Sequence, residues 1–257
     1  MDHGIALKLI QEAADRGESI AVVRLIISGA NENKLMLVQD GELVPGPGNP
    51  EIVKQILAAV ERLEARGGVA ELVEAADEQG SPLRIAIEIV RPKLQLVIFG
   101  AGHVGQSVAL MGALIGYDVI VIDDREEFAS RRRLPDPRIE LLVSDYASAA
   151  SKVSISSSTA VVIVTRGHQY DEACLKSVLG SNAIYLGMIG SRRRVLSVFK
   201  KLESEGVSER ELQRVHAPIG LKIGARSPQE IAVAILAEII DHVNNPIREQ
   251  KGERDGL

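Results

Sequence analysis

The chain has 257 residues, of which 46% are apolar and 25% are charged, and its formal net charge is −5. This length and apolar content suit one large domain or two modest ones with a real core, which excludes a disordered protein. The absence of Trp, the scarcity of other aromatic residues and the acidic balance argue against nucleic-acid binding. The single cysteine, Cys174, excludes a disulfide framework and a metal site built on several thiolates.

Two absences concern the location of the protein. No run of about 18 uncharged apolar residues occurs, and the sequence opens on Met1-Asp2 rather than on a basic segment. We therefore expect neither a membrane-spanning helix nor a secretory signal, and we predict a cytoplasmic protein.

Acidic charge is concentrated in the first third of the chain. Residues 1–92 carry 15 acidic and 9 basic side chains, whereas the remaining 165 residues have a net charge of about +1. The change falls at Arg91-Pro92, and proline disfavours a helix at the residue before it. We predict a small acidic α/β domain over residues 1–92, a Rossmann-like domain over 93–244 and a flexible charged tail over 245–257.

The first domain begins with a short helix that is expected to end at Gly17. The strand-like runs are rich in Val, Ile and Leu, and Asn49 with Pro50 provides the cap and first position of a second helix. In chain order, the expected elements are a helix over 5–15, strands over 20–27 and 34–38, a helix from residue 50, and strands over 70–75 and 83–90.

Residues 93–244 alternate apolar runs with helical segments, which is typical of a parallel sheet with crossover helices. The run Leu94–Phe99 is almost unbroken, as expected for a strand covered on both faces. Further strands are expected over 119–122, 139–143, 160–164 and 183–186, and a capped helix from Ser227-Pro228. The predicted fold class is α/β: a C-terminal Rossmann-like parallel sheet with flanking helices, preceded by a smaller N-terminal α/β domain.

A GxGxxG motif follows the first of these strands and opens a helix. Gly100 suits the tight turn, Gly102 lets the backbone approach a pyrophosphate, and Gly105 permits close helix–strand packing. Asp123 lies 18 residues after Gly105 at the end of the next strand, where an acid can accept hydrogen bonds from ribose hydroxyls. These four residues, with His103 and Val104 of the same loop, are predicted to bind a dinucleotide-like cofactor.

Later loops contribute further candidates, because ligands of such a sheet bind beyond the carboxyl ends of its strands. Arg125 could stack on a base or pair with Asp124. The loop after the fifth strand joins glycine and serine to three arginines, a combination typical of a phosphate cradle, although spacing does not say which arginines face water. The additional predicted cofactor-binding residues are Arg125, Arg166, His168, Gly190, Ser191 and Arg192.

Three histidines and the cysteine invite other chemistry. His103, His168 and His216 fall in loops expected near one end of the sheet, but a loop histidine is more often a hydrogen-bonding surface group, and we predict no metal site. Cys174 is either a buried small hydrophobe or a thiolate near His168 and Arg166. His168 and Cys174 are the candidate catalytic residues.

Six segments of the second domain form an ordered set: Phe99–Gly105, Val121–Arg125, Thr165–His168, Gly187–Arg193, His216–Leu221 and Ile223–Ala232. With these motifs, residues 94–241 resemble the C-terminal domain of the XdhC/CoxI family. Members of that family are maturation factors for xanthine dehydrogenase and related molybdenum hydroxylases, including aerobic carbon monoxide dehydrogenase.

The resemblance implies a carrier that performs no hydrolysis. Such a protein binds molybdenum cofactor, helps it receive its terminal sulfido ligand from a cysteine desulfurase, and passes it to the apo molybdenum hydroxylase. The dinucleotide form of the cofactor carries a pyrophosphate, which gives the glycine loop a role without hydride transfer. The resemblance also implies a homodimer.

The sequence departs from the family in its N-terminal domain. Members commonly carry a Gly-Gly-Cys segment, whereas Asp40–Pro50 contains no cysteine, which puts direct participation in sulfuration in doubt. Two alternatives stand beside the carrier. One is an NAD(H)-dependent oxidoreductase with His168 or Tyr170 as acid/base, and the other is a nucleotide-sensing Rossmann domain. Asp123 suits the ribose of NAD and that of a cytidine dinucleotide equally.

Overall fold

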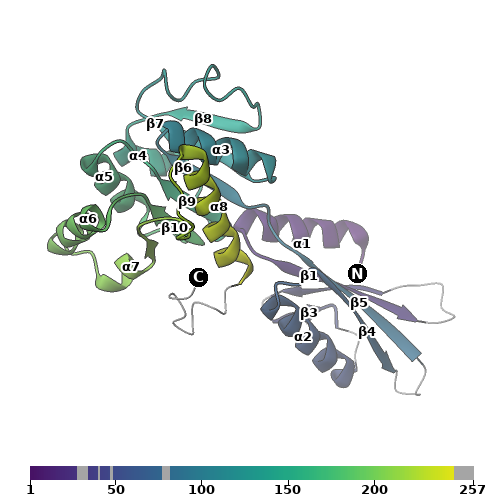
Figure 1. Cartoon of the computed structure of the whole chain (residues 1–257). Helices are drawn as coiled ribbons and strands as arrows, with labels where there is room; N and C mark the ends of the chain where they lie inside the picture. Colours follow the sequence, from purple (N-terminus) through teal and green to yellow (C-terminus); the bar gives the residue numbers. More distant parts are fainter. Residues whose placement is uncertain (28–33, 40, 47–48, 77–81, 246–257) are drawn as a thin grey trace. The chain divides into compact units, whose positions relative to one another are not determined.

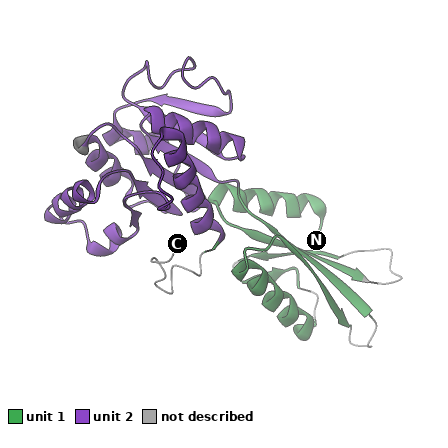
Figure 2. Cartoon of the chain, viewed as in Figure 1, with its two compact units in different colours: residues 1–92, 245–252 green, residues 93–244, 253–257 purple. Residues whose placement is uncertain are grey.

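The structure, a computed structural model, describes residues 1–27, 34–39, 41–46, 49–76 and 82–245, without the side chains of His168 and Gln169. These residues fall into two compact units, within Met1–Pro92 and Lys93–Asn244 (Figure 2). The predicted tail lies outside the described residues from residue 246 onward. Within the described ranges, no helix is both long enough and apolar enough to cross a membrane.

The N-terminal unit is built on an antiparallel five-stranded sheet with the order β3-β2-β1-β5-β4 (Figure 1). Strand β3 was not expected from the sequence, because three residues are too short to show an alternating pattern. The elements in chain order are α1 (His3–Arg16), β1 (Ile20–Ile27), β2 (Lys34–Gln39), β3 (Glu42–Val44), α2 (Pro50–Ala65), β4 (Ala70–Ala76) and β5 (Pro82–Val90).

Each helix of this unit packs an apolar face against the sheet. Helix α2 covers Val23, Ile85 and Ile87, whereas α1 packs against Val22 and Leu37 on the opposite face. The predicted end of α1 and the predicted start of α2 are confirmed. Gly17 ends α1 in the left-handed conformation, with φ 74°, and the Asn49 side chain accepts hydrogen bonds from the first amides of α2.

The second unit contains a parallel six-stranded sheet with the order β11-β10-β9-β6-β7-β8. Its strand order reverses at β6, the first strand of the unit, as in a doubly wound dinucleotide fold. The elements are β6 (Gln95–Phe99), α3 (His103–Leu114), β7 (Asp118–Asp123), β8 (Ile139–Val143), α4 (Tyr146–Ala149), η1 (Ala150–Lys152), β9 (Thr159–Ile163), α5 (His168–Val178), β10 (Tyr185–Met188), α6 (Arg192–Ser204), α7 (Glu209–Gln213), β11 (Val215–His216) and α8 (Pro228–Asn244).

Helices cover both faces of this sheet. Alternate residues of β6 separate the two cores: Leu96 and Ile98 pack with α3 and α8, whereas Val97 and Phe99 pack with α4, α5 and α6. The central strands are consequently buried along almost their whole length. Because both faces are closed, side chains can reach a ligand only from the loops at the strand ends.

Candidate functional site

The glycine loop lies at the carboxyl end of β6, next to the point where the strand order reverses. A Cβ on Gly100, whose φ is 110°, would lie 2.6 Å from the Val164 carbonyl oxygen, and a Cβ on Gly105 would lie 1.8 Å from the Gly100 carbonyl oxygen. Both positions therefore require glycine for close backbone packing. A Cβ on Gly102 would meet no atom within 4 Å, so this glycine borders open space.

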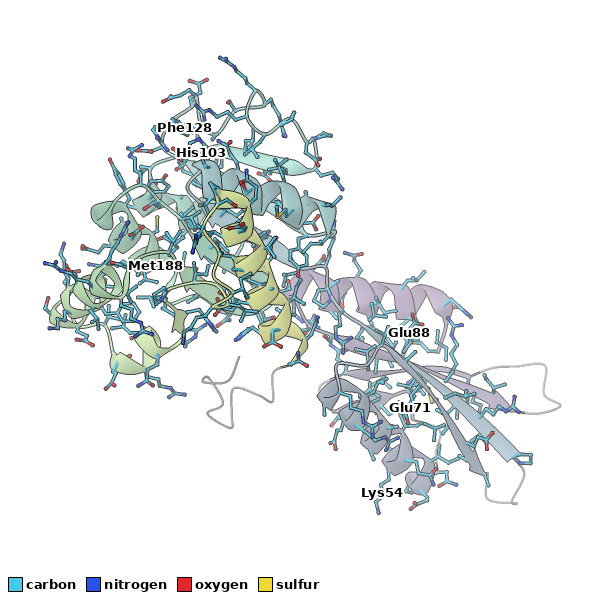
Figure 3. All side chains as sticks on the ribbon, in the orientation of Figure 1. Lys54, Glu71, Glu88, His103, Phe128 and Met188 are labelled. Carbon is cyan, nitrogen blue, oxygen red and sulfur yellow. The ribbon has the colours of Figure 1, made fainter. Side chains whose placement is uncertain are left out.

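Helix α3 starts directly after this loop. Gly102 is its N-cap residue and provides no side-chain hydrogen bond, so the first amides of α3 are not capped by the N-cap side chain. His103 begins the helix and is exposed there (Figure 3). An uncapped helix N-terminus presents N–H groups and a partial positive charge, which favour an anion.

Asp123 holds this loop in place. Its carboxylate is fully buried and accepts hydrogen bonds from the Ala101 amide at 2.8 Å, from the Arg125 amide at 3.0 Å, and from Arg125 Nε and Nη2 at 2.8 and 3.0 Å. Burial opposes ionisation, but these hydrogen bonds outweigh it and lower the pKa of Asp123. The sequence identified this acid as a ribose acceptor, whereas in the structure both its oxygens are engaged within the chain.

Arg125 was expected either to stack on a base or to pair with Asp124, and the structure shows a different main partner. Its main partner is Asp123, and its Nε lies 3.8 Å from Asp124. Its guanidinium also stacks over the Phe128 ring, with Cζ 3.4 Å from the ring centroid. The side chain remains a quarter exposed. Arg125 is therefore a fixed cation at the end of β7.

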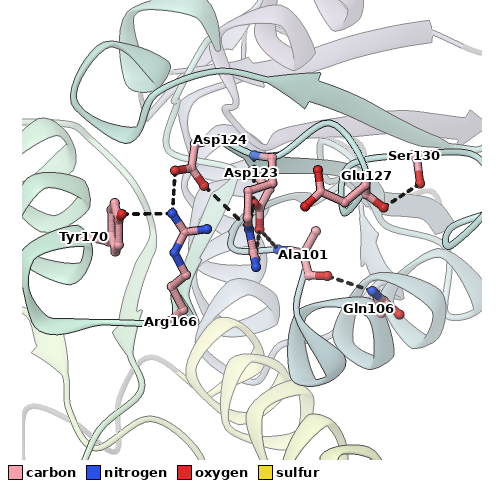
Figure 4. A network of polar contacts seen from close by, with 9 residues as sticks. Ala101, Gln106, Asp123, Asp124, Glu127, Ser130, Arg166 and Tyr170 are labelled. Atoms are coloured by element: carbon pink, nitrogen blue, oxygen red, sulfur yellow. Dashed lines mark hydrogen bonds and ion pairs between the residues drawn. The ribbon is translucent and has the colours of Figure 1, made fainter.

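Arg166 is fixed in a similar way at the end of β9. Its Nη2 donates to Asp124 at 2.8 Å and to the Tyr170 hydroxyl at 2.9 Å, and its Cζ lies 4.5 Å from the Tyr170 ring centroid (Figure 4). Since Asp124 contacts both Arg166 and Arg125, it joins the loops after β7 and β9. Tyr170 thus helps to position an arginine.

A third arginine comes from α6, and it is not the one predicted. Arg192 is exposed and does not line the cavity described below, whereas Arg194 does. Ser191 is the N-cap of α6, and its hydroxyl accepts from the Arg194 amide at 3.3 Å. The Arg194 guanidinium pairs with Asp171, which is fully buried and also accepts from the Thr165 hydroxyl at 2.5 Å.

These groups surround a cavity of about 390 Å³ at the carboxyl edge of the sheet. It is lined by Gly100, Gly102, His103, Val104, Arg125, Val164, Thr165, Arg166, Ile189, Gly190, Arg194 and Pro228. Among these described lining residues, three are arginines and none carries a carboxylate. Each of the arginines is held by an aspartate that does not itself line the cavity. The wall is therefore cationic, with the compensating charges set behind it.

The remaining reactive candidates lie apart from this wall. Cys174 is fully buried in the core, where burial and then the charge of Asp171 raise the pKa of its thiol, so the structure favours packing over a thiolate. His216 stacks on Tyr185, with ring centroids 4.5 Å apart. The His168 side chain is not among those that the structure describes. In the described part of the chain, no group of three or more His, Cys, Asp or Glu side chains is arranged to hold a metal ion.

The sequence did not single out Thr165, Asp171 or Arg194 as a unit. Thr165 and Asp171 flank a loop that was recognised as rich in titratable groups, but Arg194 lies 23 positions beyond Asp171. No spacing rule connects an α5 carboxylate with an α6 arginine. Only the packing of those helices brings them together.

The strand order, the glycine loop and the cavity at the reversal point define a Rossmann-type unit. The XdhC Rossmann domain family matches residues 96–239. The chain belongs to this family, as the sequence resemblance indicated.

Curated relatives agree with that membership. The uncharacterized protein YqeB of Escherichia coli K12 is 33% identical over 224 residues, which are 82% of this chain and 40% of that protein. A protein of Bacillus subtilis 168 named as a probable xanthine dehydrogenase component is 32% identical over 60% of this chain and 44% of its own. The molybdenum cofactor insertion chaperone PaoD of Escherichia coli K12 is 26% identical over 58% of this chain and 40% of its own. Each of these matches thus spans less than half the length of the relative.

A solved structure shares the fold of the whole chain. The crystal structure of a xanthine dehydrogenase from Bacillus halodurans matches with a TM-score of 0.68 and 23% identity, over 98% of this chain and 70% of that one. The protein is accordingly an XdhC-family protein related to a molybdenum cofactor insertion chaperone.

Proposed function

We propose that this protein binds molybdenum cofactor, in a dinucleotide form, as cargo and passes it to an apo molybdenum hydroxylase. The relation to PaoD and to a probable xanthine dehydrogenase component supports this cargo and this kind of client. The predicted cofactor-binding residues Gly100, Gly102, His103, Val104, Arg125, Arg166 and Gly190 all line one cavity, which supports a single binding site.

One observation carries the proposal: the cavity wall joins an uncapped helix N-terminus to three arginines. A cofactor dinucleotide contains a pyrophosphate, and this anion needs backbone N–H donors and cations in a confined space. The α3 N-terminus would supply the donors, and Arg125 and Arg166 would supply positive charge. Gly102 leaves room for the anion, because no atom lies within 4 Å of its Cβ position.

The oxidoreductase alternative finds less support. An NAD site of this fold uses the acid after the second strand to bind ribose hydroxyls. Here that acid, Asp123, is fully buried and paired with Arg125, which bears equally on the ribose of NAD and on that of a cytidine dinucleotide. The Tyr170 hydroxyl, an alternative acid/base, already accepts a hydrogen bond from Arg166. Tyr170 positions Arg166 but keeps its own O–H donor, so the preference for the carrier rests on the named relatives rather than on this hydroxyl.

Sulfuration of the cargo is assigned to a partner. Asp40–Pro50 contains no cysteine, and Cys174 is buried with a raised thiol pKa. We therefore propose that a cysteine desulfurase supplies the sulfur when the cofactor is sulfurated. Homodimerisation remains a prediction from the family resemblance.

The direct test is the identity of the ligand that co-purifies. The protein is purified from a host supplied with molybdate and competent in cofactor synthesis, and it is analysed by mass spectrometry and pterin fluorescence. Pterin oxidation products support the proposal. Bound NAD, with substrate-dependent absorbance of reduced nicotinamide, would overturn it.

A matched pair of glycine variants ties that ligand to the cavity. Gly102→Val places a side chain in open space at the α3 N-terminus, so we expect an intact fold and loss of the co-purifying pterin. Gly180→Val makes the same chemical change at a position that also has no atom within 4 Å but does not line the cavity. Equal pterin content in the two variants would contradict the assigned site.

A further inference from the structure

Arg194 differs from the other cavity arginines in that one of its unpaired donors is buried. Arg125 places Nε and Nη2 on Asp123, and Arg166 places Nη2 on both Asp124 and Tyr170. Arg194 forms its ion pair through Nη2, to Asp171. Its Nε is buried and has no hydrogen-bond partner among the described residues.

An unpaired buried donor is costly and calls for an explanation. A guanidinium has five N–H donors in a fixed planar fork, which matches the oxygens of a phosphoryl group. Arg194 lines the cavity and is 21% exposed, so part of its side chain is open to the space that the glycine loop borders. An anion in this cavity would therefore meet the Arg194 side chain at its wall.

The surroundings of Arg194 fix its position. Asp171 is fully buried and bonded to Thr165, so the acid that holds Arg194 cannot turn to solvent. Gly190 makes room for the arginine stem, because a Cβ there would lie 3.2 Å from Arg194 Cδ. The amide of Arg194 is bonded to Ser191. Thr165, Asp171 of α5, Gly190 and Ser191 thus hold Arg194 at the cavity wall.

We propose that Arg194 binds a phosphoryl group of the cavity's ligand, and that Gly190, Thr165 and Asp171 are its positioning residues. This inference rests on the proposed function, since it takes the same cavity as the ligand site, and it names the chemical group recognised there. The group is a diphosphate or a phosphate monoester, whether it belongs to a nucleotide or to the rest of the cargo.

Isothermal titration of the full chain with inorganic pyrophosphate, cytidine 5′-diphosphate and cytidine tests the inference. We expect the wild type to bind both phosphorylated probes and to bind cytidine much more weakly. Arg194→Ala should weaken binding of both phosphorylated probes by about tenfold or more, because a charge-assisted fork is lost. Arg192→Ala removes the same side chain two residues away, where it is exposed and outside the cavity, and should change binding less than about twofold.

The variant Arg194→Lys distinguishes a loss of phosphoryl binding from a failure to fold. It keeps a cation for the buried Asp171 but removes the planar fork, so the fold should persist while binding of pyrophosphate weakens severalfold. Near-ultraviolet circular dichroism of the tyrosines, all four of which lie in residues 93–244, verifies the fold. Folded Arg194 variants that bind pyrophosphate as well as Arg192→Ala would overturn the inference, and so would a wild type that binds neither phosphorylated probe.

The two proposals fail in different ways. If pyrophosphate binding depends on Arg194 but no pterin co-purifies with the wild type, the phosphoryl site stands and the cargo is wrong. If pterin co-purifies equally with wild type and folded Arg194→Lys, the cargo stands and the role of Arg194 is wrong.

Discussion

The two units handle polar groups in opposite ways. In the N-terminal sheet, charged side chains such as Arg24 and Glu88 alternate with buried residues and are exposed. Glu88 is labelled in Figure 3. In the Rossmann unit the strands are covered on both faces, and all the buried polar or charged residues of the described chain belong to it: Ser107, Asp123, Ser144, Thr159, Thr165 and Asp171. Both buried acids are paired with an arginine of the cavity.

This difference shows at which positions each sheet can carry the charged side chains of a binding site. A sheet face that a helix covers only in part, as α1 covers the face of Val22 and Leu37, can carry charge at its exposed positions at little cost. A doubly covered sheet confines charge to its strand ends, where removing one partner of a buried pair is costly because it leaves an unpaired buried charge. The four tyrosines all lie in the Rossmann unit, so tyrosine signals report on that unit, while far-ultraviolet signals report on both.

The largest expected effect comes from glycine packing. Gly105→Val would force the Gly100 carbonyl to move, because even a Cβ there lies 1.8 Å from that oxygen. We expect a loss of about 3 kcal/mol of unfolding free energy in urea denaturation followed by tyrosine signals. Gly68→Ala in the N-terminal unit would meet the end of the Leu63 side chain first and the Leu63 carbonyl oxygen only at 3.3 Å, and it should cost about 1 kcal/mol. This loss is followed by far-ultraviolet circular dichroism, because residues 1–92 contain no tyrosine. Equal losses of unfolding free energy in the two variants would contradict the difference in packing between the two units.

Removal of a buried acid should cause the next largest loss of unfolding free energy. Asp123→Asn leaves Arg125 without its ionic partner and should cost about 2 kcal/mol, less than a fully buried pair because Arg125 is a quarter exposed. The matched change, Glu71→Gln, breaks an exposed ion pair with Arg62 in the N-terminal unit and should cost at most about 0.5 kcal/mol. Urea midpoints of both variants measure the difference, and a larger cost for Glu71→Gln would refute it.

Acid should destabilise the Rossmann unit through the same group. The pKa of Asp123 is lowered in the folded state, so its contribution is complete above the unfolded value of about 3.9 and is lost as the pH falls through the lowered pKa. Unfolding free energy from tyrosine signals should therefore decrease below about pH 4. Asp123→Asn should flatten this decrease. A steeper decrease in the variant would show that other carboxylates dominate.

The smallest effect is expected at Cys174. Cys174→Ser places a hydroxyl in the core and should cost about 1 kcal/mol of stability. Pyrophosphate affinity should stay within about twofold of the wild type, because the thiol lies outside the cavity. A large loss of affinity in the folded variant would revive the thiolate interpretation.

Most of the fold could be predicted because its signals are local. The long apolar runs, the Asn49 cap and the Ser227–Glu230 capping box each specify their own element, and the structure has all of them. The short strands β3 and β11 escaped prediction, since two or three residues carry no periodicity. They form only because a neighbouring strand offers a hydrogen-bonding edge.

The candidate site could be predicted only as a set of loops. The sequence by itself determined that a glycine turn, an acid and an arginine-rich turn follow successive strands of a parallel sheet. Tertiary structure decided which groups face the cavity. Consecutive helical residues point about 100° apart, so the orientation of α6 selects Arg194 and leaves Arg192 in solvent. Likewise, Asp123 is engaged by Arg125 from its own turn and by the Ala101 amide of the glycine loop, and the second of these contacts depends on how closely two loops pack, which no sequence pattern encodes.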